Sequence, residues 1–220
     1  MKKIIMIAAS IFALGAAGDA MAKDDHRIVK SLALEGFDRI EFSGVYDIDV
    51  RVGKDFSIAL SGVQREMDRV EASVKGGVLH LDRSKRKDKR RWRMKREEHG
   101  IEAVITLPSL SGLDISGVVE GEVTRIDADQ FDVDISGVGD IRLDGECGML
   151  DADVSGVGDL DAKGLECRIV DVDVSGVGDA SVYASEEIDA EVSGMGDIDV
   201  YGSPKKIRKE DSMFSEVTIR

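Results

Sequence analysis

The chain has 220 residues, which suit one domain, and its formal net charge of −14 argues against a generally basic nucleic-acid-binding protein. A composition of 42% hydrophobic residues with two prolines excludes a disordered chain, whereas 24 glycines and 5% aromatic residues indicate a turn-rich β architecture. Three scattered histidines, His26, His80 and His99, offer little material for a histidine-based metal site or a catalytic triad.

Residues 1–22 have the features of a secretory signal peptide. Lys2 and Lys3 precede an apolar run, and Ala20 and Ala22 supply the small residues that a signal peptidase needs. The run is too short to span a bilayer comfortably, and no cysteine follows it to carry a lipid. We therefore expect cleavage after Ala22, export to the periplasm or the cell surface of a bacterium, and a single domain over residues 23–220.

Residues 37–81 predict short strands separated by Ser-Gly and Gly-Gly turns. Apolar and polar residues alternate in this stretch, for example at Ile40 and Phe42 and at Ile48 and Val50. The spacing is irregular, so we expect an irregular N-terminal β cap. Such a cap would cover the first regular coil, because an uncovered end offers free strand edges.

Residues 83–99 form a strongly basic loop insertion. Positions 83 to 96 contain ten basic residues and one aspartate, a local balance of +9. A solvated loop is the simplest interpretation. The alternatives are an arm that binds anionic lipid or polysaccharide, or a clasp for the acidic body of this chain or of a second copy in a homo-oligomer. Nucleic acid is not expected as a partner after export. The candidate anion-binding or membrane-binding residues are Arg90, Arg91, Trp92, Arg93, Lys95 and Arg96.

A pentapeptide of the form Ser-Gly-Val-Gly-Asp recurs five times in the second half of the chain. Its serines lie 20, 19, 20 and 18 residues apart, at Ser116, Ser136, Ser155, Ser175 and Ser193. Period-two alternation on both sides of each copy predicts two short strands and two turns per repeat.

Every repeat has a small aliphatic residue at the same position. If each repeat forms one coil stacked on the previous one, these equivalent residues pack against one another in the interior. We predict an all-β fold, a parallel β-helix (β-solenoid) with coils of about 20 residues, rather than an antiparallel meander. The glycines are expected to supply positive φ at a tight corner, and the serines to hydrogen-bond the backbone.

Carboxylates recur at fixed positions in the repeats. Between positions 101 and 203 there are 25 acidic and four basic residues, a local balance of −21. A solvated acidic face is the simplest interpretation, and Ca²⁺ binding is the functional alternative, because calcium prefers several carboxylate and carbonyl oxygens together. The candidate calcium ligands, one per turn, are Asp140, Asp159, Asp179 and Asp197.

The two cysteines share one phase of the repeat. Cys147 and Cys167 each lie eight residues before the serine of the following turn, so stacked coils would bring them about 4.8 Å apart. An exported protein meets an oxidising compartment, which favours a disulfide; two reduced, stacked thiols are the alternative.

The repeated turns, together with residues 37–50 and 101–116 and the Tyr-Gly-Ser-Pro at 201–204, resemble the head GIN domain family of auto-transporter adhesins. The resemblance spans nearly the whole mature chain. It implies a right-handed β-helix exported to the bacterial envelope, with no catalytic residues to carry over. The segment between His80 and Ile101 departs from the family, in which this connection is short.

The function predicted from the sequence is a non-catalytic exported adhesin or scaffold that binds an unidentified component of the cell envelope, with Ca²⁺ as the one candidate cofactor. The alternatives are a polysaccharide-processing β-helix enzyme and a Ca²⁺-binding surface repeat protein. The enzyme is disfavoured because every carboxylate cluster follows the repeat, whereas catalytic residues normally interrupt one.

Overall fold

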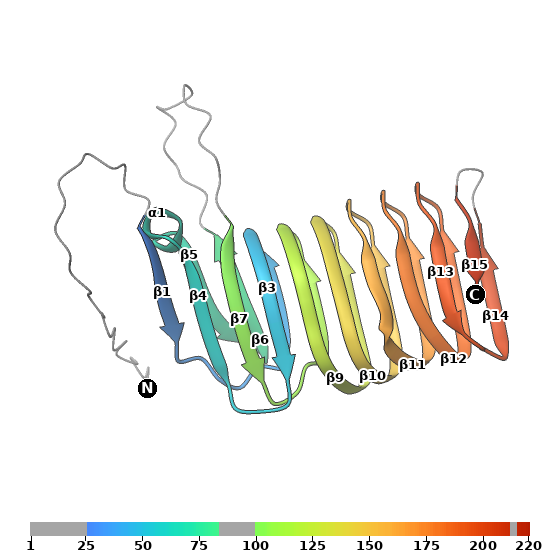
Figure 1. Ribbon diagram of the computed structural model, residues 1–220, viewed down its shortest axis with the longest axis horizontal. Helices are drawn as coiled ribbons and strands as arrows, with labels where there is room; N and C mark the ends of the chain where they lie inside the picture. Colours follow the sequence, from blue (N-terminus) through green and yellow to red (C-terminus); the bar gives the residue numbers. More distant parts are fainter. Residues whose placement is uncertain (1–25, 84–99, 212–214) are drawn as a thin grey trace, which may run out of the picture.

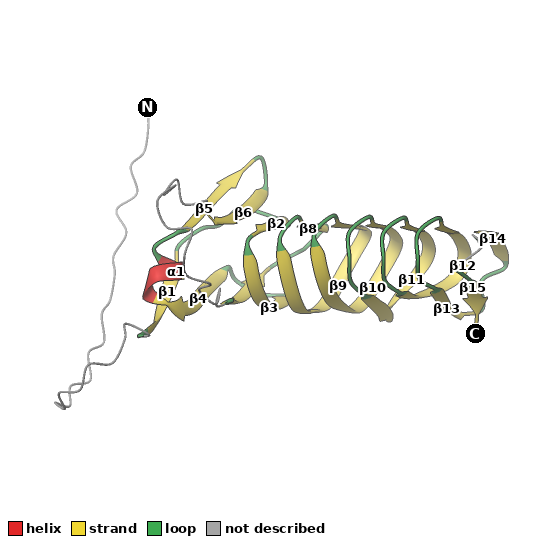
Figure 2. Ribbon diagram, turned by 90° about the horizontal axis from the view of Figure 1, so that it is seen from above, coloured by secondary structure: helices red, strands yellow, loops and turns green. Residues whose placement is uncertain are grey.

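The protein is an elongated and almost entirely β structure. The computed structural model describes residues 26–83, 100–211 and 215–220. Strands stand side by side along the long axis in Figure 1, and the view from above in Figure 2 shows the chain coiling round that axis. The predicted signal peptide, residues 1–22, lies outside the described residues.

The central coils stack through parallel strands. These strands are β8 (Gly112–Ile115), β9 (Val118–Ile135), β10 (Val138–Val154), β11 (Leu160–Val174) and β12 (Ala180–Val192). Each pairs in parallel with the next, and the register places equivalent residues of successive sequence repeats opposite one another. One inward column of equivalent residues consists of Val133, Ala152, Val172 and Ala190. The predicted β-solenoid is confirmed.

Each central coil contains one turn and one bend rather than the two turns predicted. The long strands β9 to β12 have 18, 17, 15 and 13 residues and run from one Ser-Gly-Val-Gly-Asp turn to the next. The ladder is interrupted near their middle, for instance between Leu143 and Gly145, and pairing then resumes. The chain bends there through a β-bulge, so the strand changes direction without a separate turn.

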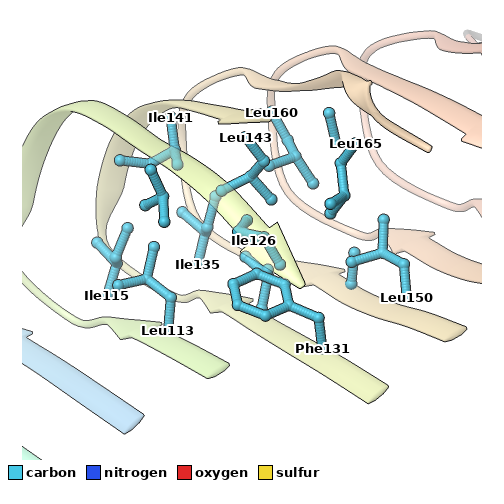
Figure 3. Packing of buried hydrophobic residues seen from close by; sticks show 14 of the residues in the cluster. Leu113, Ile115, Ile126, Phe131, Ile135, Ile141, Leu143, Leu150, Leu160 and Leu165 are labelled. Carbon is cyan, nitrogen blue, oxygen red and sulfur yellow. The ribbon is translucent and has the colours of Figure 1, made fainter. Parts of the chain in front are cut away.

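The interior of the solenoid is a continuous apolar core. Small and medium aliphatic side chains from each coil point inward and are almost completely buried, as Figure 3 shows for Leu113, Ile135 and Leu160 among others. Period-two alternation produces this arrangement, because it directs every second side chain to the inner face.

Close stacking of the backbone explains the glycines of the repeated turn. At Gly137, Gly156 and Gly176, a Cβ atom would overlap the carbonyl oxygen of the equivalent glycine one coil earlier. These first glycines have no positive φ, contrary to the prediction. The second glycine of the motif combines both constraints, since Gly178 has φ +149° and its Cβ would overlap the carbonyl oxygen of Gly158.

The predicted irregular N-terminal cap is present. It contains β1 (Arg27–Leu32), β2 (Arg39–Ser43), β3 (Val45–Val52), β4 (Ser57–Val63), α1 (Gln64–Met67), β5 (Val70–Lys75), β6 (Val78–Arg83) and β7 (Ile101–Leu107). β1, β4 and β7 pair antiparallel, β5 and β6 form a hairpin, and β3 joins β7 to β9 in parallel.

A buried carboxylate ties the cap together. Glu66 of α1 is 3% exposed, and its oxygens lie 2.9 Å from nitrogens of Arg65, Arg69 and Arg83. Burial works to raise the pKa of Glu66, but the Arg65 hydrogen bond and the charges of Arg83 and Arg69 outweigh it and lower the pKa. Arg83, predicted to open the basic insertion, is instead the buried last residue of β6.

The C-terminal end continues the coil with short strands. β13 (Ile198–Gly202) and β14 (Lys206–Glu210) both pair with β12, and β15 (Val217–Ile219) pairs with β13, all in parallel. The chain near its C-terminal end thus adds short parallel strands to the solenoid. Within the ranges that the structure describes, no helix is long and apolar enough to cross a membrane.

Candidate functional site

A column of apolar side chains lies exposed along the repeated turns. The third residue of each pentapeptide points to solvent and is 43% to 59% exposed. This apolar ladder consists of Val118, Val138, Val157, Val177 and Met195, which are neighbours in successive coils. Contiguous exposed apolar patches are uncommon on soluble monomers and mark contact surfaces. The apolar ladder was not predicted from the sequence, because the turn valine lies outside the two alternating strands of each repeat.

The four candidate calcium ligands form a column beside the apolar ladder and bond to the backbone. Oδ1 of Asp140, Asp159 and Asp179 accepts a hydrogen bond from the backbone N–H of the aspartate one coil later, at 2.8 to 3.2 Å. Oδ1 of Asp197 accepts one from the N–H of Glu216 at 2.9 Å. These carboxylates therefore have a structural role at the turn. Among the described residues no cluster of His, Cys, Asp or Glu is arranged to hold a metal ion, and calcium binding stays a prediction.

Two further columns of carboxylates lie on the strands that precede the turns, and we call them the acidic face. The first column contains Asp132, Asp151, Asp171 and Asp189, and the second contains Asp114, Asp134, Asp153, Asp173 and Glu191. Arginines pair with both ends. Arg39 contacts Asp114 at 3.1 Å and Asp132 at 2.8 Å, and Arg208 contacts Asp189 at 3.3 Å.

The middle of the acidic face is electrostatically strained. Partial burial raises the pKa of Asp134, Asp171 and Asp173, and the charge of Asp153 raises the pKa of Asp134 and Asp173 further. For Asp171, the charges of Asp189 and Asp151 add to burial. Oδ1 of Asp173 is also buried without a hydrogen-bond partner among the described residues. Like charges stacked in this way destabilise the sheet.

These shifts predict greater stability in mild acid. A carboxyl whose folded pKa lies above its unfolded value destabilises the fold at neutral pH, and this cost disappears as the pH falls through the folded pKa towards about 4. Asp171→Asn with Asp173→Asn should therefore raise the unfolding free energy at pH 7 by about 0.5–1 kcal/mol, and should reduce the gain seen as the pH is lowered from 7 towards about 4. Urea unfolding at constant ionic strength measures both. Asp144→Asn, at an exposed carboxylate elsewhere, is the control. A double variant less stable than the wild type at pH 7 would contradict the repulsion argument.

A shallow groove crosses the central coils at the bend in the middle of the long strands, away from the Ser-Gly-Val-Gly-Asp turns at the strand ends. It has a volume of about 440 Å³. Its lining residues, which define the bend groove, are Asp127, Ala128, Asp129, Glu146, Cys147, Gly148, Glu166, Cys167, Arg168, Tyr183 and Ser185. They come from β9, β10, β11 and β12, where the repeat lengths differ and the register shifts. Bulges of this kind often occur beside binding sites.

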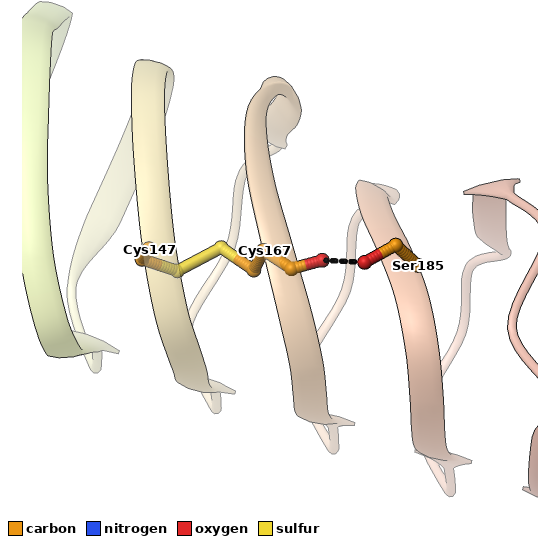
Figure 4. The surroundings of a disulfide bond; sticks show 3 residues. All are labelled: Cys147, Cys167 and Ser185. Atoms are coloured by element: carbon orange, nitrogen blue, oxygen red, sulfur yellow. Dashed lines mark hydrogen bonds between the residues drawn. A yellow bond between two sulfur atoms is a disulfide. The ribbon is translucent and has the colours of Figure 1, made fainter.

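A disulfide between Cys147 and Cys167 lies in the floor of the bend groove. The two residues are in register on β10 and β11, with their Cα atoms 4.5 Å apart, so the shared phase read from the sequence is confirmed. Figure 4 shows the bond joining neighbouring strands, with Ser185 of β12 donating a hydrogen bond to the Cys167 carbonyl oxygen at 3.4 Å. The cross-link holds two coils together just after the register shift of their ladder between Arg142 and Asp144.

Two columns of outward side chains form the sides of the bend groove. One column contains Asp127, Glu146, Glu166 and Tyr183, in register across the four strands. The other contains Asp129, Gly148 and Arg168, and a Cβ on Gly148 would lie 3.3 Å from Nη2 of Arg168. The guanidinium thus lies across the space that Gly148 leaves. Arg168 makes no hydrogen bond or ion pair with any described residue.

Residues 36–204 match the sequence profile of the family described as "Putative auto-transporter adhesin, head GIN domain". The match covers most of the chain and includes the cap from β2 onward and the repeated turns. The chain belongs to this family. The resemblance seen in the motifs is therefore confirmed for this head GIN domain.

Solved structures share the fold of this head GIN domain at low sequence identity. A "putative adhesin" from Bacteroides fragilis is 22% identical, with 89% of this chain and 97% of that chain covered and a TM-score of 0.70. A "putative adhesin" from Parabacteroides merdae is 15% identical over 88% and 95%, with a TM-score of 0.53. One from Parabacteroides distasonis is 20% identical over 89% and 98%, with a TM-score of 0.51. No curated protein matches the chain.

The remaining site predictions for this head GIN domain fall in the basic insertion. Arg90, Arg91, Trp92, Arg93, Lys95 and Arg96 lie outside the described residues. Their anion-binding or membrane-binding role stays a prediction. The bend groove was not predicted from the sequence. Two signals could have indicated it: the unequal spacing of the repeats, and Arg168 and Tyr183, which interrupt the repeated pattern of residue types.

Proposed function

We propose that this head GIN domain is a non-catalytic adhesion module of the bacterial envelope that makes contact through its apolar ladder. The observation that carries the proposal is the exposure of an apolar side chain in all five turns, at residues aligned along one edge of the solenoid. The family and the similar structures, named as adhesins, support an adhesin-like role on an exported protein.

The geometry of the apolar ladder suits attachment to an extended surface. Its members follow one another at the coil spacing of about 4.8 Å, and backbone hydrogen bonds between coils hold them in line. Because the backbone is already ordered, contact requires little loss of conformational entropy. The turn aspartates beside the ladder keep the surface hydrated when no partner is bound, which limits aggregation.

Binding without turnover also agrees with the arrangement of the carboxylates. The acidic face and the turn column both repeat from coil to coil. Arginines pair with the ends of the acidic face, and the turn carboxylates accept hydrogen bonds from backbone N–H groups. A glycoside-cleaving pair would instead need one carboxyl acting as acid and a second as base or nucleophile across a single bond. Polysaccharide processing remains the alternative that the experiment below distinguishes.

Co-sedimentation with envelope fragments tests the proposal. The triple variant Val138→Thr, Val157→Thr and Val177→Thr keeps the β-branched shape but removes the apolar surface, so bound protein should fall at least fivefold. The control replaces three other exposed apolar residues with threonine: Val29, Val104 and Ile207. It should bind as the wild type does.

The same incubations are assayed for new reducing ends. Binding with no increase in reducing ends supports an adhesion module, whereas a steady increase would establish the processing enzyme instead. Loss of binding in the control variant to the same degree would show that the apolar ladder is not the contact surface.

A further inference from the structure

We propose that the bend groove is a second binding site, which takes a neutral glycan and places one sugar ring against Tyr183. The site is separate from the apolar ladder, because it lies at the bend of β9 to β12 while the ladder lies at their turns. The inference therefore goes beyond the adhesive contact proposed above and does not depend on it.

The polar groups of the groove match the hydroxyl groups of a sugar. Glu146 and Glu166 are exposed and make no hydrogen bond with a described residue, so their oxygens can accept bonds from sugar O–H groups. The unpaired Arg168 guanidinium offers N–H donors to sugar oxygens in the same groove. Each hydroxyl group of a sugar ring can both donate and accept a hydrogen bond, so a sugar site needs acceptors and donors close together.

Tyr183 supplies the apolar part of the site. Its side chain is half-buried on the wall of the groove and follows Glu166 in the same outward column. An aromatic face packs against the C–H groups of a pyranose ring, while the phenol oxygen stays available to water or to a hydroxyl. A site made only of carboxylates would lack this surface.

The charges in the groove select against anionic ligands. Asp127, Asp129, Glu146 and Glu166 would repel an anionic polysaccharide or a phosphate headgroup. Arg168, whose guanidinium lies beside Gly148, adds one positive charge and its N–H donors to this acidic lining. A neutral ligand avoids this repulsion and can use both the carboxylates and the guanidinium as hydrogen-bond partners.

The shape of the groove suits a chain of sugars rather than a compact molecule. It is open to solvent and crosses four successive coils, each displaced by about 4.8 Å along the axis. The Cys147–Cys167 disulfide and the hydrogen bond from Ser185 join three of these coils, so the floor is preorganised.

Calorimetric titration of the purified protein with cellohexaose, maltohexaose and hexa-N-acetylchitohexaose tests the inference. Saturable binding of at least one of the three, with one site per chain, is expected. Tyr183→Ala and Arg168→Gln should each weaken that binding at least tenfold. Tyr201→Ala is the matched control, because Tyr201 is in register with Tyr183 one coil later but does not line the groove; it should change affinity less than twofold.

Folding and salt dependence complete the experiment. Arg168 is exposed and unpaired, so Arg168→Gln tests the site even if Tyr183→Ala destabilises the coil. Absence of saturable binding to all three hexasaccharides overturns the inference, and so does equal weakening by Tyr183→Ala and Tyr201→Ala. Binding of a nona-arginine peptide instead, with a steep loss between 50 and 300 mM salt, would assign the groove to cationic peptides and also overturn it. Envelope binding that persists in Tyr183→Ala leaves the adhesive function intact, which separates the two proposals.

Discussion

Replacing Gly178 with alanine is expected to lower the free energy of unfolding by about 3 kcal/mol or more, a larger effect than alanine at the first glycine of the same turn. Two costs combine at this position. Gly178 has φ +149°, where a residue with a Cβ is strained, and the new Cβ would overlap the carbonyl oxygen of Gly158 in the preceding coil. That oxygen belongs to the backbone and has no freedom to rotate away.

Two other glycines separate the two costs. Gly53 has φ +125° but nothing within 4 Å of its Cβ position, so Gly53→Ala should cost only the conformational strain, about 1–2 kcal/mol. Gly176 has no positive φ but would overlap Gly156, so Gly176→Ala measures the coil contact alone. Urea unfolding followed by far-ultraviolet circular dichroism gives the three values. Equal losses for Gly178→Ala and Gly53→Ala would show that coil stacking does not constrain the turn.

Replacing Glu66 with glutamine or alanine is expected to cost about 3–5 kcal/mol. The carboxylate is buried among three arginines, and Arg83 is itself only 5% exposed in its side chain. Removing the negative charge takes away the carboxylate that lies 2.9 Å from that buried guanidinium. Arg65 and Arg69 are more exposed and can be rehydrated, which places the expected loss towards the lower end of the range.

The pH dependence of the Glu66 variants provides a second measurement. The pKa of Glu66 is lowered in the folded state, so its contribution is present above the unfolded pKa of about 4.3 and is lost as the pH falls through the folded pKa. The wild type and Glu66→Gln should therefore converge in stability as the pH falls below that range. Glu71→Gln, at an exposed carboxylate on β5, is the control and should change stability by less than about 0.5 kcal/mol. A loss below 1 kcal/mol for Glu66→Gln would show that water replaces the carboxylate.

The repeats allowed much of the fold to be predicted from the sequence. The recurring pentapeptide and the period-two alternation at residues such as Val133 and Ala152 are local patterns that one parallel coil satisfies, and the structure places those residues in register. The alignment of Cys147 with Cys167 followed from the same phase. Repetition makes such inferences reliable because each coil has the same neighbours as the next.

The cap and the bend could not be predicted in the same way. The pairing of β1 with β4 and of β4 with β7 joins segments of different composition, and no repeated signal specifies it. The burial of Glu66 by Arg83 depends on the packing of α1 against the sheet, so the local charge pattern alone assigned Arg83 to a solvated loop.

The sequence by itself determined the coil, its period, its inward residues and the glycine positions, because these properties depend on alternation and on the smallest side chain that a stacked backbone tolerates. Apart from the turn aspartates, which recur in the pentapeptide, the tertiary structure decided which outward residues meet. The apolar ladder and the bend groove arise from residues that are about 20 positions apart in sequence, and their separation in space depends on where β-bulges shift the register. Backbone hydrogen bonding between coils sets those shifts. Register is therefore a property of two paired coils, and the sequence of one repeat does not specify it.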